Sequence, residues 1–267
     1  MNAKQIGVST ASLFKRMYNE DSVRFLNESG VGCSEVFLGT YREYKKEYAD
    51  LLNNNKGHLK IHSVHTLNTH FEPQLFSANP RALEDAYFIA EDVLECARIL
   101  GAKYYTFHGV ARIKRKVKYD NYAAIGEKFH MLTQKCAEYG VELALENVEW
   151  AYYNHPGFFS AVKEYSPAIK GTLDIKQARD SGDGYIPFLN EMGKDIVTVH
   201  VSDFDNDGKL CLPGKGNFNF GELFKRLNGV GFDGAVLIEV YKENYQTLDE
   251  LIQSYEYLQN LAERNSK

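Results

Sequence analysis

The strongest constraint in this sequence is a short apolar run that recurs along the whole chain, each time followed by a longer amphipathic segment. Each run has about five or six residues, which is the usual length of a β-strand and too short for a helix. The runs span residues 5–9, 33–38, 60–65, 103–108, 141–146, 169–174, 196–201 and 235–239. We therefore predict eight strands.

The segments between the runs carry helix signals. Residues 81–100 place apolar side chains on one face of a helix, and Gly101 follows at the position of a C-cap glycine. Residues 122–139 show the same pattern and stop at Gly140, and residues 249–261 predict a final amphipathic helix. Strands of one direction that are joined by crossover helices form a parallel sheet.

Eight strand–helix units predict a (β/α)₈ TIM barrel of the α/β class, as one domain over residues 1–267. A chain of 267 residues has the usual size of such a barrel. A doubly wound open sheet is the competing arrangement. Against it, no Gly-x-Gly-x-x-Gly turn follows the first run, and eight is the number of units that closes a barrel. No linker or low-complexity stretch divides the chain.

Composition excludes several classes of protein. Hydrophobic residues make up 44% and charged residues 25%, as in soluble globular domains. The net charge of −5 and a single basic run at 112–118 do not indicate a nucleic-acid partner. The four cysteines have no CxxC spacing, so neither a disulfide framework nor a thiolate zinc site is indicated. Without a signal peptide or an apolar stretch of about 18 residues, we expect a cytoplasmic protein with no membrane partner.

Ionisable side chains stand at the ends of several predicted strands. They are His65, His108, Glu146, Asp174, His200 and Glu239. In a parallel barrel the carboxyl ends of the strands meet, so we expect these side chains to converge on one axial site. Three carboxylates there would repel one another, and a divalent cation bound by them together with an imidazole removes that repulsion.

We therefore predict that Glu146, Asp174, His200 and Glu239 bind one divalent metal ion. Each residue alone has a simpler interpretation: a strand-end histidine is usually a core residue, and Asp174 could cap the following helix. His65 and His108 remain open between metal-binding, substrate-contacting and structural roles. His62 points to the opposite face of its strand from His65, because side chains alternate along a strand.

A long connection rich in Gly, Asp and Asn, residues 202–219, follows the seventh run. Asp205–Gly208 has the composition of a hairpin turn. We expect this loop to lie over the mouth of the barrel, with Lys215 as its anion contact. Aromatic residues near strand ends are available to stack on a sugar, although core packing explains each one alone: Phe14, Tyr18, Phe37, Tyr41, Phe71, Phe107 and Trp150.

The strand-end motifs resemble the xylose-isomerase-like TIM-barrel superfamily, in its branch of sugar and sugar-phosphate isomerases and epimerases. The motifs are VELALENV, GTLDIKQA, VTVHVSD, LPGKGNFNF and VLIEVY. The resemblance implies one divalent metal ion on Glu146, Asp174, His200 and Glu239, with manganese expected first and magnesium, cobalt or zinc as alternatives. It also implies that Glu146 and Glu239 are the acid/base pair of a reaction through a cis-enediolate.

A sugar or sugar phosphate is therefore the expected substrate, with His65, His108, Lys176 and Lys215 as expected contacts. Many relatives form dimers or tetramers, so a homo-oligomer is compatible with the resemblance. The residues do not choose between epimerisation, which returns the proton to the other face of the same carbon, and isomerisation, which returns it to the neighbouring carbon.

Two other activities stay open. The endonuclease branch of the superfamily, which uses three zinc ions, shares His65 and His108 and the four predicted ligands. This chain has Gln177 where that branch has a histidine, and it has no further histidine in the loop after His200. An endonuclease-like phosphodiesterase is therefore the first alternative. The second is a dehydratase of an inositol-derived ketone, which starts from the same enediolate and expels water.

Overall fold

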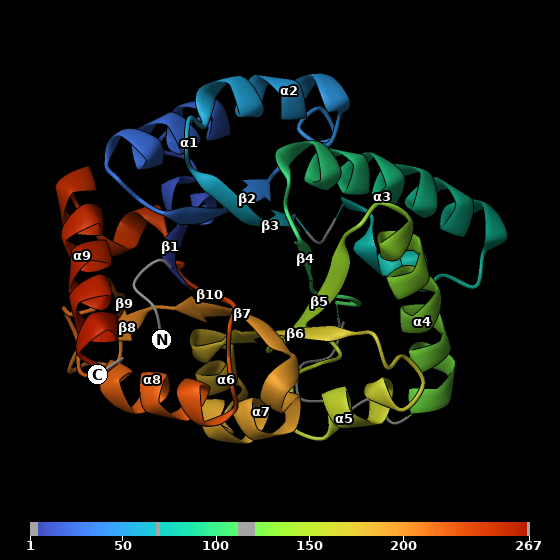
Figure 1. Cartoon of the computed structure of the whole chain (residues 1–267). Helices are drawn as coiled ribbons and strands as arrows, with labels where there is room; N and C mark the ends of the chain where they lie inside the picture. The colour runs from blue at the N-terminus through green and yellow to red at the C-terminus, as the bar shows by residue number, and fades with distance from the viewer. Residues whose placement is uncertain (1–4, 68–69, 112–120, 266–267) are drawn as a thin grey trace.

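The strands of the chain close into a parallel barrel (Figure 1), as predicted from the repeated apolar runs. The computed structural model describes residues 5–67, 70–111 and 121–265. Around the barrel the strands follow the order β1-β10-β7-β6-β5-β4-β3-β2. Their bounds are β1 (Ile6–Ser9), β2 (Cys33–Leu38), β3 (Lys60–Thr66), β4 (Tyr104–Phe107), β5 (Glu142–Glu146), β6 (Lys170–Asp174), β7 (Ile196–Val201) and β10 (Ala235–Ile238).

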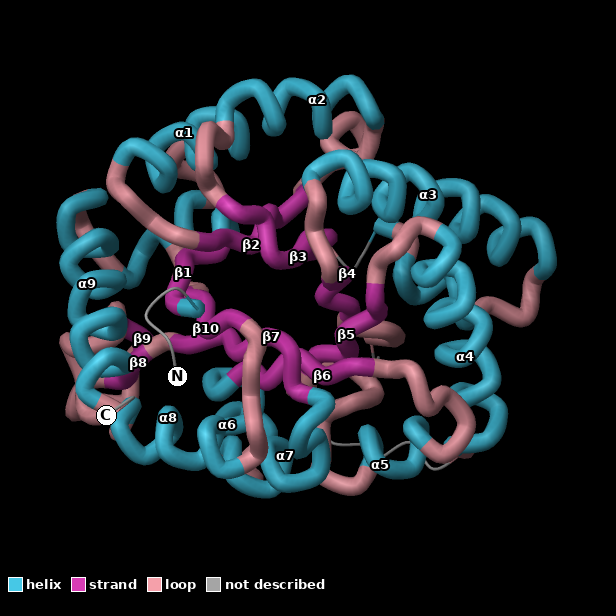
Figure 2. Tube along the Cα trace, in the orientation of Figure 1, coloured by secondary structure: helices cyan, strands magenta, loops and turns pink. Residues whose placement is uncertain are grey.

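Helices form an outer layer around these strands (Figure 2). They are α1 (Asn19–Glu28), α2 (Lys46–Asn55), α3 (Pro80–Leu100), α4 (Tyr122–Glu138), α5 (Phe158–Lys163), α6 (Ile175–Ser181), α7 (Tyr185–Met192), α8 (Phe220–Gly229) and α9 (Leu248–Arg264). Local sequence sets their ends: the Asn79 side chain caps the start of α3, and Gly101 ends α3 with a φ of 70°. Within the described residues, no helix is both long and apolar enough to cross a membrane.

Short 3-10 helices follow three of the strands. They are η2 (Thr10–Leu13) after β1, η4 (Glu72–Phe76) after β3 and η6 (Lys242–Asn244) after β10. The Arg16 side chain, just after η2, donates to the main-chain carbonyl of Gln246 and so ties the first loop to the last one. These segments bring side chains from distant parts of the sequence to the carboxyl end of the barrel.

The long connection after β7 forms a hairpin, β8 (Asp203–Phe204) paired antiparallel with β9 (Leu210–Cys211). The predicted turn is confirmed, because the N–H of Gly208 donates to the carbonyl of Asp205. The Asp203 carboxylate accepts N–H bonds from Gly214, Gly216 and Phe218 and so fixes the path of the loop. The basic run at 112–118 lies outside the described residues.

Strand register places the ionisable residues side by side. Asp174 of β6 pairs with His200 of β7, and Glu35 of β2 pairs with Ser9 of β1 on one side and with Ser63 of β3 on the other. Because neighbouring strands lie about 4.8 Å apart, paired residues on the same face are within reach of one another. The closed barrel thus gathers these groups around one axis.

The packing of β10 against β7 leaves no room for a side chain at Gly234. A Cβ atom at this position would meet the main-chain carbonyl of Val197, whereas a Cβ at Gly229, in α8, would meet nothing within 4 Å. We expect Gly234→Ala to lower the free energy of unfolding by about 1–3 kcal/mol, because backbone must move to accept the methyl group. Gly229→Ala is the matched control and should be neutral or stabilising by up to about 1 kcal/mol. Urea unfolding of both variants measures the difference, and equal stabilities would contradict this packing.

Candidate metal centre

The four predicted metal ligands lie at the carboxyl end of the barrel. Glu146 and Asp174 are the last residues of β5 and β6, His200 lies in β7, and Glu239 directly follows β10. Glu146, Asp174 and His200 each offer a ligand atom, and these atoms lie within 4.8 Å of one another. The Nδ1 atom of His200 lies 3.1 Å from Glu146 Oε1 and 3.2 Å from Glu239 Oε2. His200 is therefore the residue that links the two glutamates.

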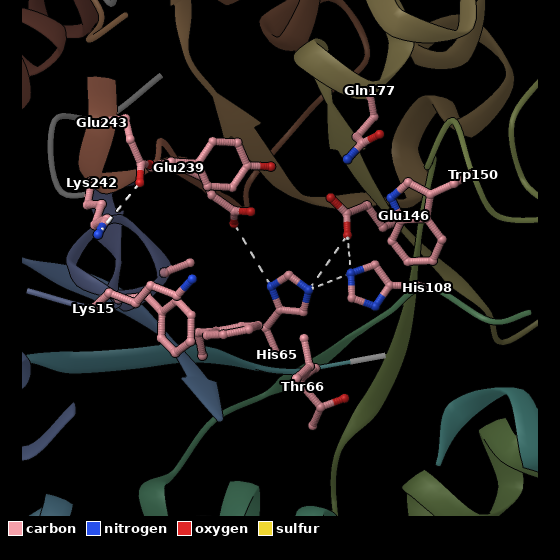
Figure 3. A pocket seen from close by; sticks show the side chains of 15 residues that line it. Lys15, His65, Thr66, His108, Glu146, Trp150, Gln177, Glu239, Lys242 and Glu243 are labelled. Carbon is pink, nitrogen blue, oxygen red and sulfur yellow. Dashed lines mark hydrogen bonds and ion pairs between the residues drawn. The ribbon is translucent and has the colours of Figure 1, made fainter. Parts of the chain in front are cut away.

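A cavity of about 370 Å³ opens beside these residues (Figure 3). Glu146 and Glu239 both line it, and they lie at opposite ends of the His65 ring: Nε2 of His65 is 3.8 Å from Glu146, and Nδ1 is 3.9 Å from Glu239. The volume is within the range of cavities that bind small molecules. Two carboxylates can therefore reach a bound small molecule from different sides.

Aromatic side chains form much of the remaining wall. Phe14, Phe37 and Trp150, from the predicted aromatic set, line the cavity. Phe71 and Phe107, from the same set, are fully buried in the core. Phe37 meets the His65 ring edge-on, and Trp150 lies against His108. The cavity thus combines apolar rings with ionisable groups.

His65 and His108 meet inside the site. Their Nε2 atoms are 2.8 Å apart, and Nε2 of His108 is 3.4 Å from Glu146 Oε2. Two nitrogen atoms at this distance share one proton between them, because two lone pairs or two N–H groups would repel. Both imidazoles line the cavity, so contact with a substrate remains a prediction for each of them.

Glu35 and Glu72 are buried carboxylates that the strand-end pattern did not reveal. Glu35 Oε1 lies 3.0 Å from His200 Nε2 and 3.3 Å from His65 Nδ1. Glu72, in η4, accepts hydrogen bonds from the Thr66 and Tyr105 hydroxyls and lies 3.3 Å from His108 Nδ1. For Glu35, the one available signal was an acidic residue in the middle of an apolar strand run, because such groups are rarely buried without a partner.

Burial and charge act against each other on these groups. Burial raises the pKa of Asp174 to about 7, and the nearby Lys176 only partly opposes this. For Glu146 burial also raises the pKa, but the hydrogen bond and charge of His200 outweigh it and bring the pKa to about 2. Burial lowers the pKa of His200, but the Glu239 and Glu35 carboxylates outweigh it and hold the pKa well above its usual range. The metal-free site therefore carries protons that partly neutralise its carboxylates.

Four buried atoms of the site have no aligned hydrogen bond within the described part of the chain. They are His65 Nδ1, Glu146 Oε2, His200 Nε2 and Glu239 Oε2. The two nitrogens face Glu35 Oε1 at 3.3 and 3.0 Å. Buried polar atoms without aligned partners, here the oxygens of Glu146 and Glu239, usually indicate a missing ion, water or ligand. The donor set is carboxylate and imidazole, which suits several divalent metals. The residues present therefore fit a divalent cation.

Gln177 and Lys176 lie at the start of α6. Gln177 lines the cavity, and its side-chain oxygen accepts the N–H of Glu149. Lys176 donates to the Tyr241 hydroxyl at 2.6 Å and lies over the Tyr241 ring. Tyr241 is part of the cavity wall, while Lys176 is not among the described lining residues. Contact between Lys176 and a substrate therefore stays a prediction.

Lys215 and its loop are not among the described residues that line this cavity. Lys215 is exposed, and none of the described lining residues comes from 202–219. Hydrogen bonds to Asp203 hold this loop, and the carbonyl of Pro213 accepts a bond from Ser254 in α9. The expectation that the loop covers the cavity therefore has no support in the lining residues, and an anion contact by Lys215 is a prediction only.

Comparison with solved structures shows that other proteins share this fold. The solved structure of a D-tagatose 3-epimerase-like protein has a TM-score of 0.77 and 19% identity, with 98% of each chain covered. The structure of an IOLI protein with a bound zinc atom has a TM-score of 0.78 and 18% identity, covering 98% of this chain and 99% of that one. These similarities concern the fold.

Sequence comparison gives one partial match and one match to almost the whole chain. The uncharacterized protein MJ1311 of Methanocaldococcus jannaschii is 27% identical over 132 residues, which are 45% of this chain and 42% of that protein. The chain therefore matches less than half of the length of that relative. Residues 23–261 match the family model described as a xylose isomerase-like TIM barrel. The chain belongs to the xylose isomerase-like TIM barrel family.

Proposed function

We propose that this protein is a divalent-metal-dependent isomerase or epimerase of a sugar or sugar phosphate. The observation that carries the proposal is that Glu146, Asp174 and Glu239 lie around His200. Both glutamates also line the cavity, at opposite ends of the His65 ring. Membership in a family whose solved neighbours include a protein described as epimerase-like supports an enzyme of this kind.

The proposed ligands are Glu146, Asp174, His200 and Glu239. Manganese is the metal expected first, and magnesium, cobalt or zinc suit the same mixed donor set. A divalent ion held there would polarise a substrate carbonyl and thereby acidify the C–H bond of the neighbouring carbon, which carries the hydroxyl group. We assign the acid/base roles to Glu146 and Glu239: one carboxylate would take the proton from carbon, and the other would return it.

Other cavity residues would hold the sugar. Phe14, Phe37 and Trp150 offer apolar faces on which the C–H groups of a sugar ring can pack. The imidazoles of His65 and His108 line the cavity within 3.8 and 3.4 Å of Glu146 Oε2 and would offer hydrogen bonds to hydroxyl groups. Return of a proton to the opposite face of the original carbon gives an epimer, and return to the adjacent carbon gives an isomer.

A phosphodiesterase is the second candidate, and one observation favours it. His65, His108 and Glu146 form a further group of three buried ligand atoms within 4.8 Å of one another. Gln177 counts against it, because an amide is a poor metal ligand at the position where the endonuclease branch has a histidine. Incubation of an abasic-site duplex with zinc tests this candidate, and nicking of the duplex would favour it over the isomerase.

The first prediction concerns proton transfer. A panel of ketoses and ketose phosphates in deuterated water with Mn²⁺ should give at least one substrate that acquires solvent deuterium on a single carbon. Glu146→Gln and Glu239→Gln should each slow this exchange by about 10²- to 10⁴-fold, because a general base is lost. Glu222→Gln, on the outer helix α8 and paired with Arg226, is the control and should exchange normally. NMR measures the exchange, and full exchange in Glu146→Gln would refute the proposed base.

The second prediction concerns metal binding and pH. In the metal-free protein His200 is protonated at pH 7, and Asp174, with its pKa of about 7, is protonated in about half of the molecules. Both must lose these protons to bind a cation, so binding should release about one to two protons near pH 7. Affinity for Mn²⁺ should therefore rise from pH 6 to pH 8. Calorimetry in buffers of different ionisation enthalpy measures the release, and a pH-independent affinity would contradict the ligand set.

The third prediction concerns Asp174 and stability. Its pKa is raised in the folded protein, so the stability it contributes is present below about pH 4 and is lost as the pH rises through about 7. Asp174→Asn removes the buried charge while the side-chain oxygen can still cap α6. At pH 8 the metal-free variant should be more stable than the wild type by at most about 4 kcal/mol.

Two comparisons control this third prediction. At pH 4 the stability gain should vanish, because Asp174 is then protonated in the wild type. In excess Mn²⁺ at pH 8 the order should reverse, because only the wild type gains the binding energy of the ion. Thermal unfolding with and without the metal measures both. A variant that is less stable than the wild type in both states would show that Asp174 is structural.

A further inference from the structure

Glu35 lies beneath the proposed metal site and not in the cavity. It comes from the middle of β2, is fully buried, and is not one of the lining residues found in the described chain. A substrate in the cavity therefore does not meet this carboxylate. Glu35 nevertheless touches two residues of the site, His65 and His200.

Three hydroxyl groups hold Glu35 as an anion. The Ser63 and Thr106 hydroxyls each donate to Oε2 at 2.7 Å, and the Ser9 hydroxyl donates to Oε1 at 3.3 Å. Hydrogen bonds donated to a carboxylate stabilise its charged form over its protonated form. A neutral carboxylic acid at this position would have to turn its own proton toward one of these donors or toward a histidine. The surroundings of Glu35 are therefore those of a buried carboxylate.

This anion constrains the proton of His200. Nε2 of His200 lies 3.0 Å from Glu35 Oε1, and a nitrogen lone pair facing a carboxylate oxygen at that distance would be repelled. The same holds for Nδ1 in the metal-free protein, where Nδ1 is bonded to Glu146. A cation bound by Glu146, Asp174 and Glu239 would lie on the Nδ1 side of the ring and displace that proton, and the Glu35 anion then keeps the remaining proton on Nε2. The other ring nitrogen, Nδ1, is then the only one that can offer a lone pair, and it faces Glu146 at 3.1 Å and Glu239 at 3.2 Å.

We propose that Glu35 is a positioning residue that keeps the proton on His200 Nε2 and so makes His200 Nδ1 the metal-binding atom. The proposal rests on the metal-dependent function proposed above. The same carboxylate lies 3.3 Å from His65 Nδ1 and so leaves His65 Nε2 directed at Glu146 and His108. One buried anion thus sets the orientation of two imidazoles, which is the role that outer carboxylates have in other histidine–metal sites.

The competing role for Glu35 is that of a direct ligand. Glu35, His65, His200 and Glu239 also offer ligand atoms within 4.8 Å of one another. The ring nitrogens that face Glu35, His65 Nδ1 and His200 Nε2, have no aligned hydrogen bond in the described chain, and neither do Glu146 Oε2 and Glu239 Oε2, so these four atoms fit either role. The hydroxyl contacts distinguish the two roles, because a cation on Glu35 would compete with three hydroxyl donors for that carboxylate. They favour the positioning role, and the experiment below separates the two.

The test uses the full chain loaded with Zn²⁺, which is diamagnetic. Long-range ¹H–¹⁵N spectra of the imidazoles should show His200 protonated on Nε2 and coordinated through Nδ1. Glu35→Gln should weaken Zn²⁺ binding by about 10- to 100-fold in a chelator competition. Glu72→Gln is the matched control, because Glu72 is an equally buried carboxylate that contacts His108 and not His200. It should change the affinity by less than about threefold.

Four results would overturn the proposal. The first is a wild-type His200 that is protonated on Nδ1. The second and third are a Glu35→Gln variant with wild-type Zn²⁺ affinity, and an equal loss of Zn²⁺ affinity in Glu35→Gln and Glu72→Gln. The fourth is an X-ray absorption spectrum with one carboxylate ligand fewer in Glu35→Gln, which would make Glu35 a ligand. If Glu35→Gln does not fold, the wild-type spectrum alone decides which nitrogen carries the proton. A wild-type protein that coordinates Zn²⁺ through Nδ1 but exchanges no sugar proton would refute the proposed function and leave this proposal standing. One that binds no Zn²⁺ would refute both.

Discussion

The organisation of this protein depends on how it neutralises a group of carboxylates that the barrel buries together. Glu35, Glu146 and Asp174 are almost fully enclosed, and Glu239 is only 14% exposed. Charges placed this close in a medium of low polarity repel strongly unless cations or hydrogen-bond donors offset them. In the metal-free state the imidazoles of His65 and His200, together with a proton on Asp174, supply that compensation. A divalent cation would replace these protons.

The barrel meets this requirement through a chain of contacts. Hydroxyl groups from three strands, those of Ser9, Ser63 and Thr106, donate to Glu35. Glu35 contacts the imidazoles of His200 and His65, and His200 contacts Glu146 and Glu239, which line the cavity. A change at Glu35 would therefore reach the cavity through the orientation of the imidazoles.

The residues around the cavity differ in how firmly they are held. Gln177 is tied to the main chain of Glu149, and Trp150 lies against His108. Phe14 is 45% exposed at the rim, and Lys15 beside it adopts a φ of 64°, which is unusual for a residue with a side chain. Contacts within the site thus hold Gln177 and Trp150, whereas the rim is formed by loops that can differ among barrels of one family. Substrate choice would then depend on the rim and proton transfer on the ionisable residues.

The sequence by itself determined the barrel and the convergence of Glu146, Asp174 and His200. Strand lengths, helix stops and strand-end residues are local patterns, and in a closed parallel sheet the residues at the carboxyl ends of the strands lie close together. Glu239 was predicted in the same way and faces His200. Glu35 was missed because the sequence of its strand does not specify which buried groups will face it. Those partners depend on closure of the barrel, which brings β2, β3 and β7 around one axis. Tertiary structure also decided the path of residues 202–219. The Asp203 carboxylate binds three N–H groups of that loop, and no spacing in the sequence specifies such a contact.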